Sequence, residues 1–198
     1  MAQPSQPHPI RTDYPVVGPP ARYACWMDYL LEVVIGHGAS GSAATMEPFA
    51  AGLRRRGIAA RAIDLPRRRA EDAVPALFAI APPGPAMVLA GHSFGGRVAS
   101  LAAAEAAYRG LVCFSYPLHR PGAPGSLRTE HWPRISCPVL LLSGEADPFA
   151  RLDLLRASVA LLPRADLVTY PRLGHSLLPV LDDVLDRVAR FVRELPPP

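Results

Sequence analysis

The sequence predicts an α/β fold of three layers, in which a mostly parallel sheet of about six strands carries helices on both faces. First, short apolar runs alternate along the chain with helical patterns, as in a parallel sheet with crossover helices. Second, a turn of the pattern Gly-x-Ser-x-Gly joins one apolar run to one helical pattern. Third, the 198 residues are 49% hydrophobic and 19% charged, which suits a packed globular domain.

The predicted strands are six short apolar runs, at 30–35, 58–63, 86–90, 111–115, 138–142 and 167–170. Between and after them, helical patterns occupy 46–53, 97–108, 152–162 and 181–192. Gly57 follows the first of these helices, Pro163 follows the third, and Pro179 precedes the last. Glycine after a helix and proline near either end are typical of helix boundaries.

Residues 1–26 are rich in proline and predict a partly disordered tail, and 27–195 form the single predicted domain. The tail lacks the basic start and apolar core of a secretory signal. No apolar run approaches the roughly 20 residues of a membrane helix. Cys25, Cys113 and Cys137 show no metal-ligand spacing, and we expect reduced, buried thiols. These observations predict a cytoplasmic protein with neither a membrane partner nor a metal.

The most informative motif is Gly91-His92-Ser93-Phe94-Gly95, which lies between the third predicted strand and the helical pattern after it. In this context the motif predicts a nucleophile elbow, a tight turn that holds the serine hydroxyl out of the sheet. Its glycines let strand and helix approach closely, and the helix N-terminus favours developing negative charge. The alternative is a tight turn in an unreactive sheet protein.

Two partners for Ser93 follow in the order that such an elbow requires. Asp147 comes just after the fifth predicted strand, and His175 comes just before the last helix. An imidazole can activate the serine when one tautomer is fixed, and we expect Asp147 to fix it. Glu145 is the alternative acid. Asp147 could otherwise cap a helix near Phe149, and His175 could lie in an ordinary turn.

A glycine-rich loop at 36–41 follows the first predicted strand. The amides of Ala39 and Phe94 are the predicted oxyanion donors, because Phe94 is the residue after the nucleophile. His37 lies in the same loop and is a candidate substrate contact, with a structural hydrogen bond as the alternative. His92 is expected to pack beside the elbow.

The connection at 116–134 is long and rich in proline and glycine. It follows the fourth predicted strand, at the edge of the sheet where loops carry chemistry. If Arg120 or Arg128 faces the site, an anionic substrate is implied. The alternative is a surface loop with solvated side chains. The candidate substrate contacts in this connection are His119, Arg120, Arg128, His131 and Trp132.

All 21 basic residues are arginines, and the formal net charge is +4. Runs of three arginines occur at 54–56 and 67–69, without interleaved aromatic residues. The first run lies at a predicted helix C-terminus, where positive charge is favoured. We interpret these arginines as a solvated face and predict no nucleic-acid partner.

The ordered set Ser93, Asp147 and His175 resembles the α/β-hydrolase superfamily over about residues 30–195. The resemblance implies that these residues are nucleophile, acid and base. The chain departs from the full fold in two respects: its short, proline-rich start predicts a minimal sheet, and no inserted cap is visible in the sequence. Further motifs are similar to the small branch related to dienelactone hydrolases, which includes bacterial hydrolases, a testis-expressed protein and the hydrolase-like subunit of the chromatin NSL complex. These motifs are Tyr116-Pro-Leu-His119, Pro121-Gly122, Leu127-Arg128, His131 and Gly144-Glu-Ala-Asp147-Pro-Phe149.

The sequence therefore predicts a serine hydrolase of carboxylesterase or thioesterase type. It would cleave a small-molecule ester or thioester of a small acyl group through an acyl-enzyme, with no cofactor. The alternative is a binding or scaffold protein that keeps the fold without turnover. Peptidase, haloperoxidase-like and acyltransferase activities use the same three residue types and stay open.

Overall fold

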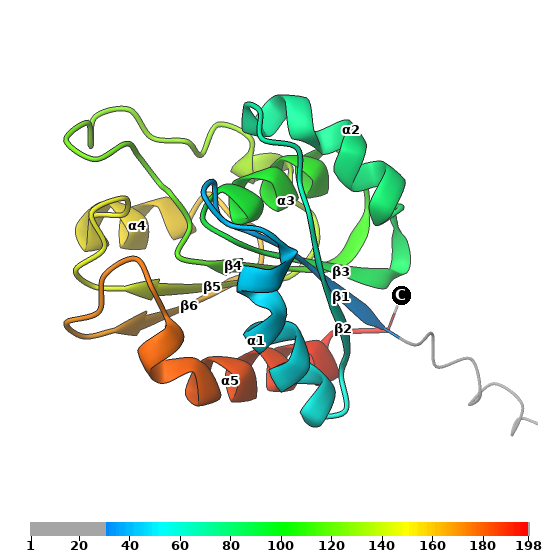
Figure 1. Ribbon diagram of the computed structural model, residues 1–198. Helices are drawn as coiled ribbons and strands as arrows, with labels where there is room; N and C mark the ends of the chain where they lie inside the picture. The colour runs from blue at the N-terminus through cyan, green and yellow to red at the C-terminus, as the bar shows by residue number, and fades with distance from the viewer. Residues whose placement is uncertain (1–30, 198) are drawn as a thin grey trace, which may run out of the picture.

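The computed structural model describes residues 31–197, which form one sheet between two layers of helices (Figure 1). The predicted three-layer α/β fold is confirmed. The predicted tail at 1–26, the first residues of the predicted domain and Cys25 lie outside the described residues. No helix in the described part of the chain has the length and apolar character needed to cross a bilayer.

Six parallel strands form the sheet, in the order β2-β1-β3-β4-β5-β6. Each strand lies within a few residues of its predicted position. The central strands are almost continuously apolar because helices cover both faces of the sheet. The strands are β1 (Glu32–Gly36), β2 (Ala59–Ile63), β3 (Gly84–His92), β4 (Tyr108–Phe114), β5 (Val139–Gly144) and β6 (Ala165–Tyr170).

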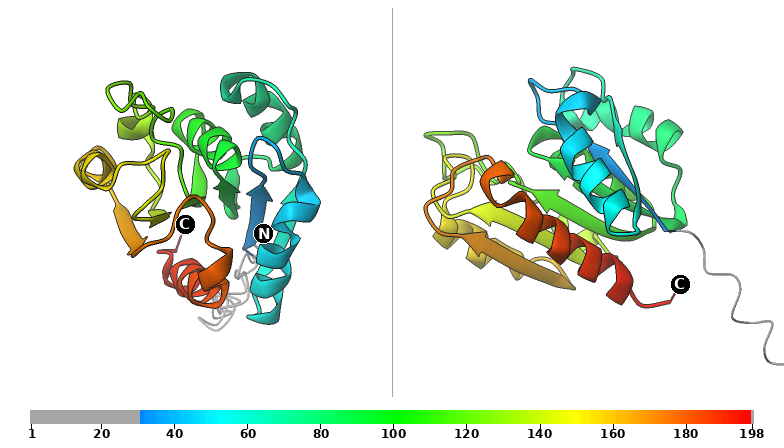
Figure 2. Two further views of the ribbon diagram at one scale, coloured as in Figure 1. Left: turned by 60° about the vertical axis from the view of Figure 1, so that its left-hand side comes forward. Right: turned by 60° about the horizontal axis from the view of Figure 1, so that its bottom comes forward.

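Right-handed crossovers decide which face of the sheet a connecting helix covers. The chain moves from β1 outward to the edge strand β2, so α1 lies on one face, where α5 joins it. From β2 onward the chain crosses the sheet in the opposite direction, which places α2, α3 and α4 on the other face (Figure 2). The helices are α1 (Ala43–Arg55), α2 (Ala70–Ile80), α3 (Phe94–Glu105), α4 (Leu152–Val159) and α5 (Leu181–Glu194).

This reversal of direction occurs between the neighbouring strands β1 and β3. The loops that follow these two strands diverge to opposite faces and leave a crevice at their carboxyl ends. Ser93 directly follows β3, and the glycine-rich loop directly follows β1. The register pairs Gly36 with Gly91, so both loops start at the same level of the sheet. The topology therefore brings the elbow and the glycine-rich loop together.

An apolar core lies on each face of the sheet. Under α1 and α5, the ring centroids of Phe49 and Phe114 are 4.9 Å apart, and Leu185 is fully buried. Under α2, α3 and α4, the rings of Tyr116 and Trp132 lie 5.1 Å apart. Burial of such side chains, worth about 25 cal/mol per Å² of apolar surface, is the main favourable contribution to folding.

Helix α2 is absent from the sequence prediction. Pro75 lies inside it, and a proline removes one intrahelical hydrogen bond. Pro75 is exposed, so its ring faces solvent while the helix packs through the opposite side. Strand β4 begins at Tyr108, three residues before the predicted start, and the helix before it ends at Glu105. The buried residues of α2 have helical spacing. They are Ala70, Ala73, Val74 and Leu77.

The long connection between β4 and β5 forms no helical cap within the described residues. Its regular element is the 3₁₀-helix η2 (Trp132–Arg134). The Tyr116 hydroxyl donates to the backbone carbonyl of Arg128 at 2.6 Å. The Arg128 amide donates to the carbonyl of Leu118 at 2.8 Å. These bonds fix the part of the loop that lies next to the crevice.

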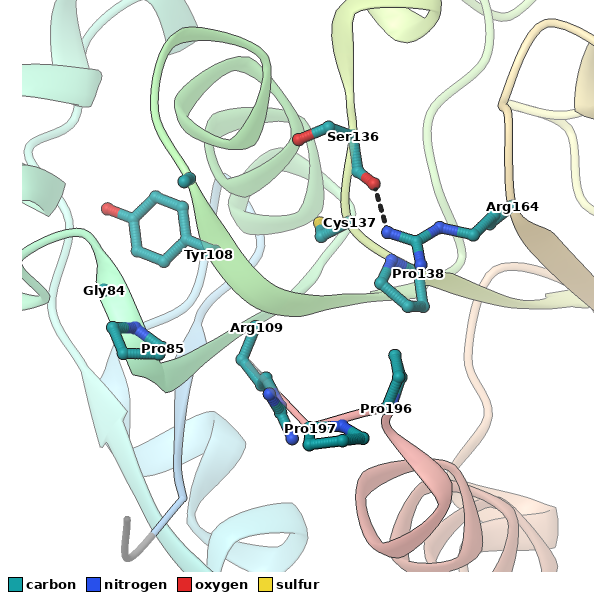
Figure 3. A pocket seen from close by; sticks show the side chains of 11 residues that line it. Gly84, Pro85, Tyr108, Arg109, Ser136, Cys137, Pro138, Arg164, Pro196 and Pro197 are labelled. Atoms are coloured by element: carbon teal, nitrogen blue, oxygen red, sulfur yellow. Dashed lines mark hydrogen bonds between the residues drawn. The ribbon is translucent and has the colours of Figure 1, made fainter.

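A cavity of about 420 Å³ opens at the amino ends of β3, β4 and β5, the edge of the sheet opposite Ser93 (Figure 3). Arg109, Arg164 and the terminal prolines Pro196 and Pro197 line it. The guanidinium of Arg164 donates to the backbone carbonyl of Ser136 at 2.6 Å. This cavity contains none of the predicted site residues, so it is separate from the crevice.

The buried face of α5 gives a stability prediction. Leu185→Ala should lower the free energy of unfolding by about 2–5 kcal/mol, because it leaves a void in a fully buried position. Leu161→Ala is the control, since Leu161 is 44% exposed and should change stability by about 1 kcal/mol or less. Urea unfolding of the full chain, followed by circular dichroism, measures both. Equal effects of the two substitutions would contradict the assigned core.

Candidate active site

Ser93 lies in a strained turn between β3 and α3. Its φ of 50° and ψ of −111° are outside the conformations that residues with a side chain usually adopt. The Ser93 amide donates to the carbonyl of Phe114, and the Gly95 amide donates to the carbonyl of His37, both at 2.9 Å. Neighbouring strands therefore hold the turn on both sides. Strain of this kind persists where the surrounding structure imposes it, and it is concentrated at functional sites.

The glycines of the motif permit a very close approach of backbones. A Cβ on Gly91 would lie 2.2 Å from the carbonyl carbon of Gly95. A Cβ on Gly95 would lie 2.4 Å from the carbonyl oxygen of Gly36. Because these contacts are to backbone atoms, no side-chain rotation could relieve them. The start of α3 can therefore reach β1 and β3 only with glycine at these positions.

The structure brings Ser93, Asp147 and His175 into one hydrogen-bonded chain. Oγ of Ser93 lies 2.8 Å from Nε2 of His175, and Nδ1 of His175 lies 2.8 Å from Oδ2 of Asp147. A carboxylate only accepts, so Nδ1 carries the proton and Nε2 is free to accept from the serine hydroxyl. The Asp147 side chain is fully buried and the His175 side chain is 23% exposed. The base thus faces the crevice while the acid is shielded from water.

The two carboxylates after β5 have different roles. The second oxygen of Asp147 accepts from the Phe149 amide at 2.8 Å, which closes a turn, and α4 begins only at Leu152. Asp147 therefore does not cap a helix at Phe149. Glu145 accepts from the Thr169 hydroxyl at 2.8 Å and makes no hydrogen bond to His175. Of the two, only Asp147 contacts His175.

His92 and Phe149 position His175. Nε2 of His92 donates to the backbone carbonyl of His175 at 3.0 Å, which ties the loop after β6 to the end of β3. Burial lowers the pKa of His92, so the neutral ring is favoured. The ring centroid of Phe149 lies 4.4 Å from that of His175. Sequence reasoning gave Phe149 no role in the site and assigned His92 to packing alone. The signal available in the sequence was position: His92 directly precedes Ser93, and Phe149 lies two residues after Asp147.

The predicted oxyanion donors lie beside the serine. Ala39 lines both cavities that Ser93 lines, and Phe94 lines one of them. Phe94 is the first residue of α3, so its amide has no acceptor within the helix. The Ala39 amide donates to no other described residue. Both amides are thus available to a bound oxygen.

Two cavities meet at Ser93. The first, of about 410 Å³, is lined mostly by apolar groups from α1 and from the loop after β6, including Met46, Phe49 and Leu177. The second, of about 430 Å³, lies on the side of α2 and of the connection between β4 and β5. Ser93, Ala39 and Phe149 line both. A substrate bound over the serine can therefore extend in two directions.

Two predicted substrate contacts, His37 and His119, are instead structural. His37 is 2% exposed, and its ring donates to the Gly38 carbonyl at 2.7 Å and accepts from the Leu65 amide at 3.1 Å. His119 is 3% exposed, and its ring donates to the Arg120 carbonyl at 2.8 Å and accepts from the Arg151 amide at 3.0 Å. Neither ring has a free nitrogen for a substrate.

His131 is fully buried and lies outside both cavities, as does Trp132. Nε2 of His131 is 2.8 Å from the Ser100 hydroxyl, so this side chain links the long connection to α3. Arg120 and Arg128 of the same connection do line the second cavity. The prediction of substrate contacts here was wrong for the histidines and Trp132, and it stays a prediction for the two arginines.

No group of three or more potential metal ligands comes together within the described part of the chain. Cys113 and Cys137 are buried and unpaired, as predicted. Burial raises the pKa of both thiols, that of Cys137 to about 11, so neither is a thiolate at neutral pH. The cysteines are therefore unsuited to act as nucleophiles.

His131 makes stability depend on pH. Burial lowers its pKa to about 4, whereas an unfolded chain binds the proton near pH 6.5. Its contribution to stability is present above pH 6.5 and is lost as the pH falls toward 4. Between pH 7 and pH 5, His131→Asn should flatten this dependence by about 2 kcal/mol. Urea unfolding of both proteins at pH 7 and pH 5 measures the difference; parallel losses in the two would contradict a neutral, buried His131.

Solved structures share the fold of this chain. Est1E from Butyrivibrio proteoclasticus, solved with ferulic acid, has a TM-score of 0.70 at 17% identity over 83% of this chain and 89% of its own. A monoacylglycerol lipase from Paleococcus ferrophilus has a TM-score of 0.69 at 16% identity over 81% of this chain and 93% of its own. These likenesses show a common fold. The family model described as an alpha/beta hydrolase domain matches residues 67–189, and the chain therefore belongs to the α/β-hydrolase family.

Proposed function

We propose that this α/β hydrolase is a serine hydrolase that cleaves an ester or thioester of a small carboxylic acid through an acyl-enzyme. The observation that carries the proposal is the uninterrupted chain from Oγ of Ser93 through His175 to buried Asp147, with both links at 2.8 Å. Nucleophile, base and acid are in the order and geometry that acyl transfer by a serine requires. Two structural neighbours, one named as a monoacylglycerol lipase and one described among lipolytic enzymes, agree with ester chemistry.

In the first step, Nε2 of His175 takes the proton of the Ser93 hydroxyl as Oγ attacks the substrate carbonyl carbon. The imidazolium that forms is stabilised by the Asp147 carboxylate, which also keeps the ring in one orientation. The tetrahedral intermediate then collapses, the bond to the leaving oxygen or sulfur breaks, and His175 donates its proton to the leaving group. The acyl group remains bound to Oγ of Ser93.

The amides of Ala39 and Phe94 form the oxyanion hole in this proposal. Both are free of other acceptors and lie beside the serine, where the carbonyl oxygen becomes an oxyanion. The position of Phe94 at the N-terminus of α3 adds the favourable end of the helix dipole. Removing one such donor costs an enzyme about 10²–10³-fold in kcat.

In the second step, His175 removes a proton from water as the water oxygen attacks the acyl-enzyme. A second tetrahedral intermediate collapses to release the acid, and the proton returns to Ser93. The 23% exposure of His175 and the openness of the crevice permit water to reach the base. All of these steps use side chains and amides of this chain.

A binding or scaffold protein with this fold would need neither the strained serine nor its hydrogen-bonded base. Retention of both favours turnover, since the strain at Ser93 costs stability of the order of 1–3 kcal/mol.

Reaction with a fluorophosphonate probe tests the proposed nucleophile. We expect wild-type protein to be labelled, and Ser93→Ala and His175→Ala to lose labelling. On 4-nitrophenyl butyrate, both variants should lower kcat by at least about 10³-fold, and Asp147→Asn by about 10⁴-fold. Intact-mass spectrometry and steady-state kinetics on the full chain provide the measurements.

Ser136→Ala is the matched control, because Ser136 is an exposed serine at the opposite edge of the sheet. It should retain wild-type labelling and activity. A folded wild-type protein that is neither labelled nor active on esters and thioesters would refute the proposed function and favour the binding or scaffold alternative.

His92 gives a second prediction as a positioning residue. His92→Leu removes the hydrogen bond to the His175 carbonyl, and kcat should fall about tenfold with little change in KM, since the bond orients the base rather than the substrate. His92→Gln, which keeps a donor, should restore part of the loss. Steady-state kinetics of both variants distinguish this role from packing, for which Leu would serve at least as well as Gln.

A further inference from the structure

The second cavity at Ser93 is strongly cationic. Five arginines line its volume of about 430 Å³, and Glu71 is the one carboxylate among the described residues that line it. The arginines come from three separate parts of the chain: the start of α2, the first turn of α3 and the connection between β4 and β5. They are Arg68, Arg69, Arg97, Arg120 and Arg128. Tertiary structure, rather than one basic run, produces this concentration of charge.

Glu71 neutralises only part of the positive charge in this cavity. Glu71 accepts from Arg97 at 2.6 Å, lies 3.8 Å from Arg69, and has its pKa lowered by the Arg97 hydrogen bond. Nη1 of Arg97 is buried and has no hydrogen-bond partner in the described part of the chain. Leaving such a group unpaired is costly.

Arg68, Arg120 and Arg128 make no ion pair with the carboxylates of residues 31–197. Arg128 is half-buried, and the backbone bonds of its loop fix its position. Its Nη1 donates weakly to the Pro117 carbonyl at 3.4 Å, which leaves most of the guanidinium uncommitted. Burial and the neighbouring charges of Arg97 and Arg120 lower the pKa of Arg128, a sign of uncompensated positive potential.

The first cavity differs sharply in character. Its lining includes Met46, Phe49, Leu177 and Leu178, and no arginine or carboxylate of residues 31–197. The two cavities share Ser93, so an ester bound at the serine would place one part in apolar surroundings and the other among arginines. The asymmetry therefore distinguishes the two halves of the substrate.

The position of the base decides which half occupies which cavity. His175 lines the apolar cavity and not the cationic one. The leaving group must receive its proton from Nε2 of His175, so the alcohol or thiol part lies on the apolar side. The carbonyl oxygen faces the amides of Ala39 and Phe94. The remaining substituent of the tetrahedral carbon, the acyl chain, extends toward the arginines.

Resting on the proposed serine hydrolase function, we infer that the preferred substrate is a half-ester of a dicarboxylic acid, whose second carboxylate lies among Arg97, Arg120 and Arg128. Guanidinium groups bind carboxylates with two parallel hydrogen bonds, and binding in a partly buried cavity strengthens the pairing. The leaving group on this assignment is uncharged and apolar.

Three esters test the inference. The first is 4-nitrophenyl hydrogen adipate, with a carboxylate on the acyl chain; the second is its methyl ester, matched but neutral; the third is 4-(hexanoyloxy)benzoate, with the carboxylate on the leaving group. We expect wild-type kcat/KM to be about tenfold or more higher for the first than for the second. The third ester should show no advantage over the methyl ester. Added salt should reduce the preference for the hydrogen adipate over its methyl ester.

Substitutions locate the preference. Arg128→Gln should lower kcat/KM on the hydrogen adipate about ten- to hundredfold and on the methyl ester less than about threefold. Arg120→Gln, at an exposed position, is the second variant should Arg128→Gln fail to fold. Arg164→Gln is the matched control, because Arg164 lines the cavity at the opposite edge of the sheet (Figure 3), and it should leave the preference unchanged.

The outcomes separate the inference from the function on which it rests. Equal wild-type kcat/KM on the two adipate esters, or equal losses on both in Arg128→Gln, would overturn the inference while the hydrolase function stands. A preference for 4-(hexanoyloxy)benzoate would overturn the orientation. Failure of all three esters together with failure of fluorophosphonate labelling would refute the proposed function itself.

Discussion

The contact of helix α3 with strands β1 and β3 sets the geometry of the whole carboxyl edge. Gly91 and Gly95 have no room there for a Cβ, and the chain can enter α3 so abruptly only through the strained conformation of Ser93. That one turn fixes where the serine oxygen lies and where the first amides of α3 point. The hydrogen bond to His175 and both cavities are arranged around this point.

Buried and half-buried histidines hold the surrounding loops in place. His37 joins the loop after β1 to that after β2, and His119 joins the connection after β4 to the loop that carries Asp147. His92 joins the elbow to the loop that carries His175. An imidazole can donate with one nitrogen and accept with the other, which suits it to linking two backbone segments without a charge. The loops thus form one cross-linked layer above the sheet.

Charge is distributed unevenly over the molecule. Arginines at 54–56 lie around the end of α1, where Arg56 bonds Asp182 and Asp186 and is compensated. Arginines around α2 and the long connection greatly outnumber the carboxylates beside them. Arginine therefore forms surface ion pairs on one side of the molecule and makes one side of the site positively charged on the other.

The dienelactone-related branch of the family, suggested by sequence motifs, stays a prediction.

The sequence by itself determined the six strands, most helices, the elbow and the ordered serine, acid and histidine, because apolar period and turn chemistry are local properties of the chain. It did not predict α2, because Pro75 interrupts the helical pattern of that segment. Only tertiary structure decided that His37, His119 and His131 are buried links and that Arg68, Arg97 and Arg128 share one cavity. The reason is physical: the partner of a polar side chain depends on which distant segments the crossovers bring together, and no local pattern records that.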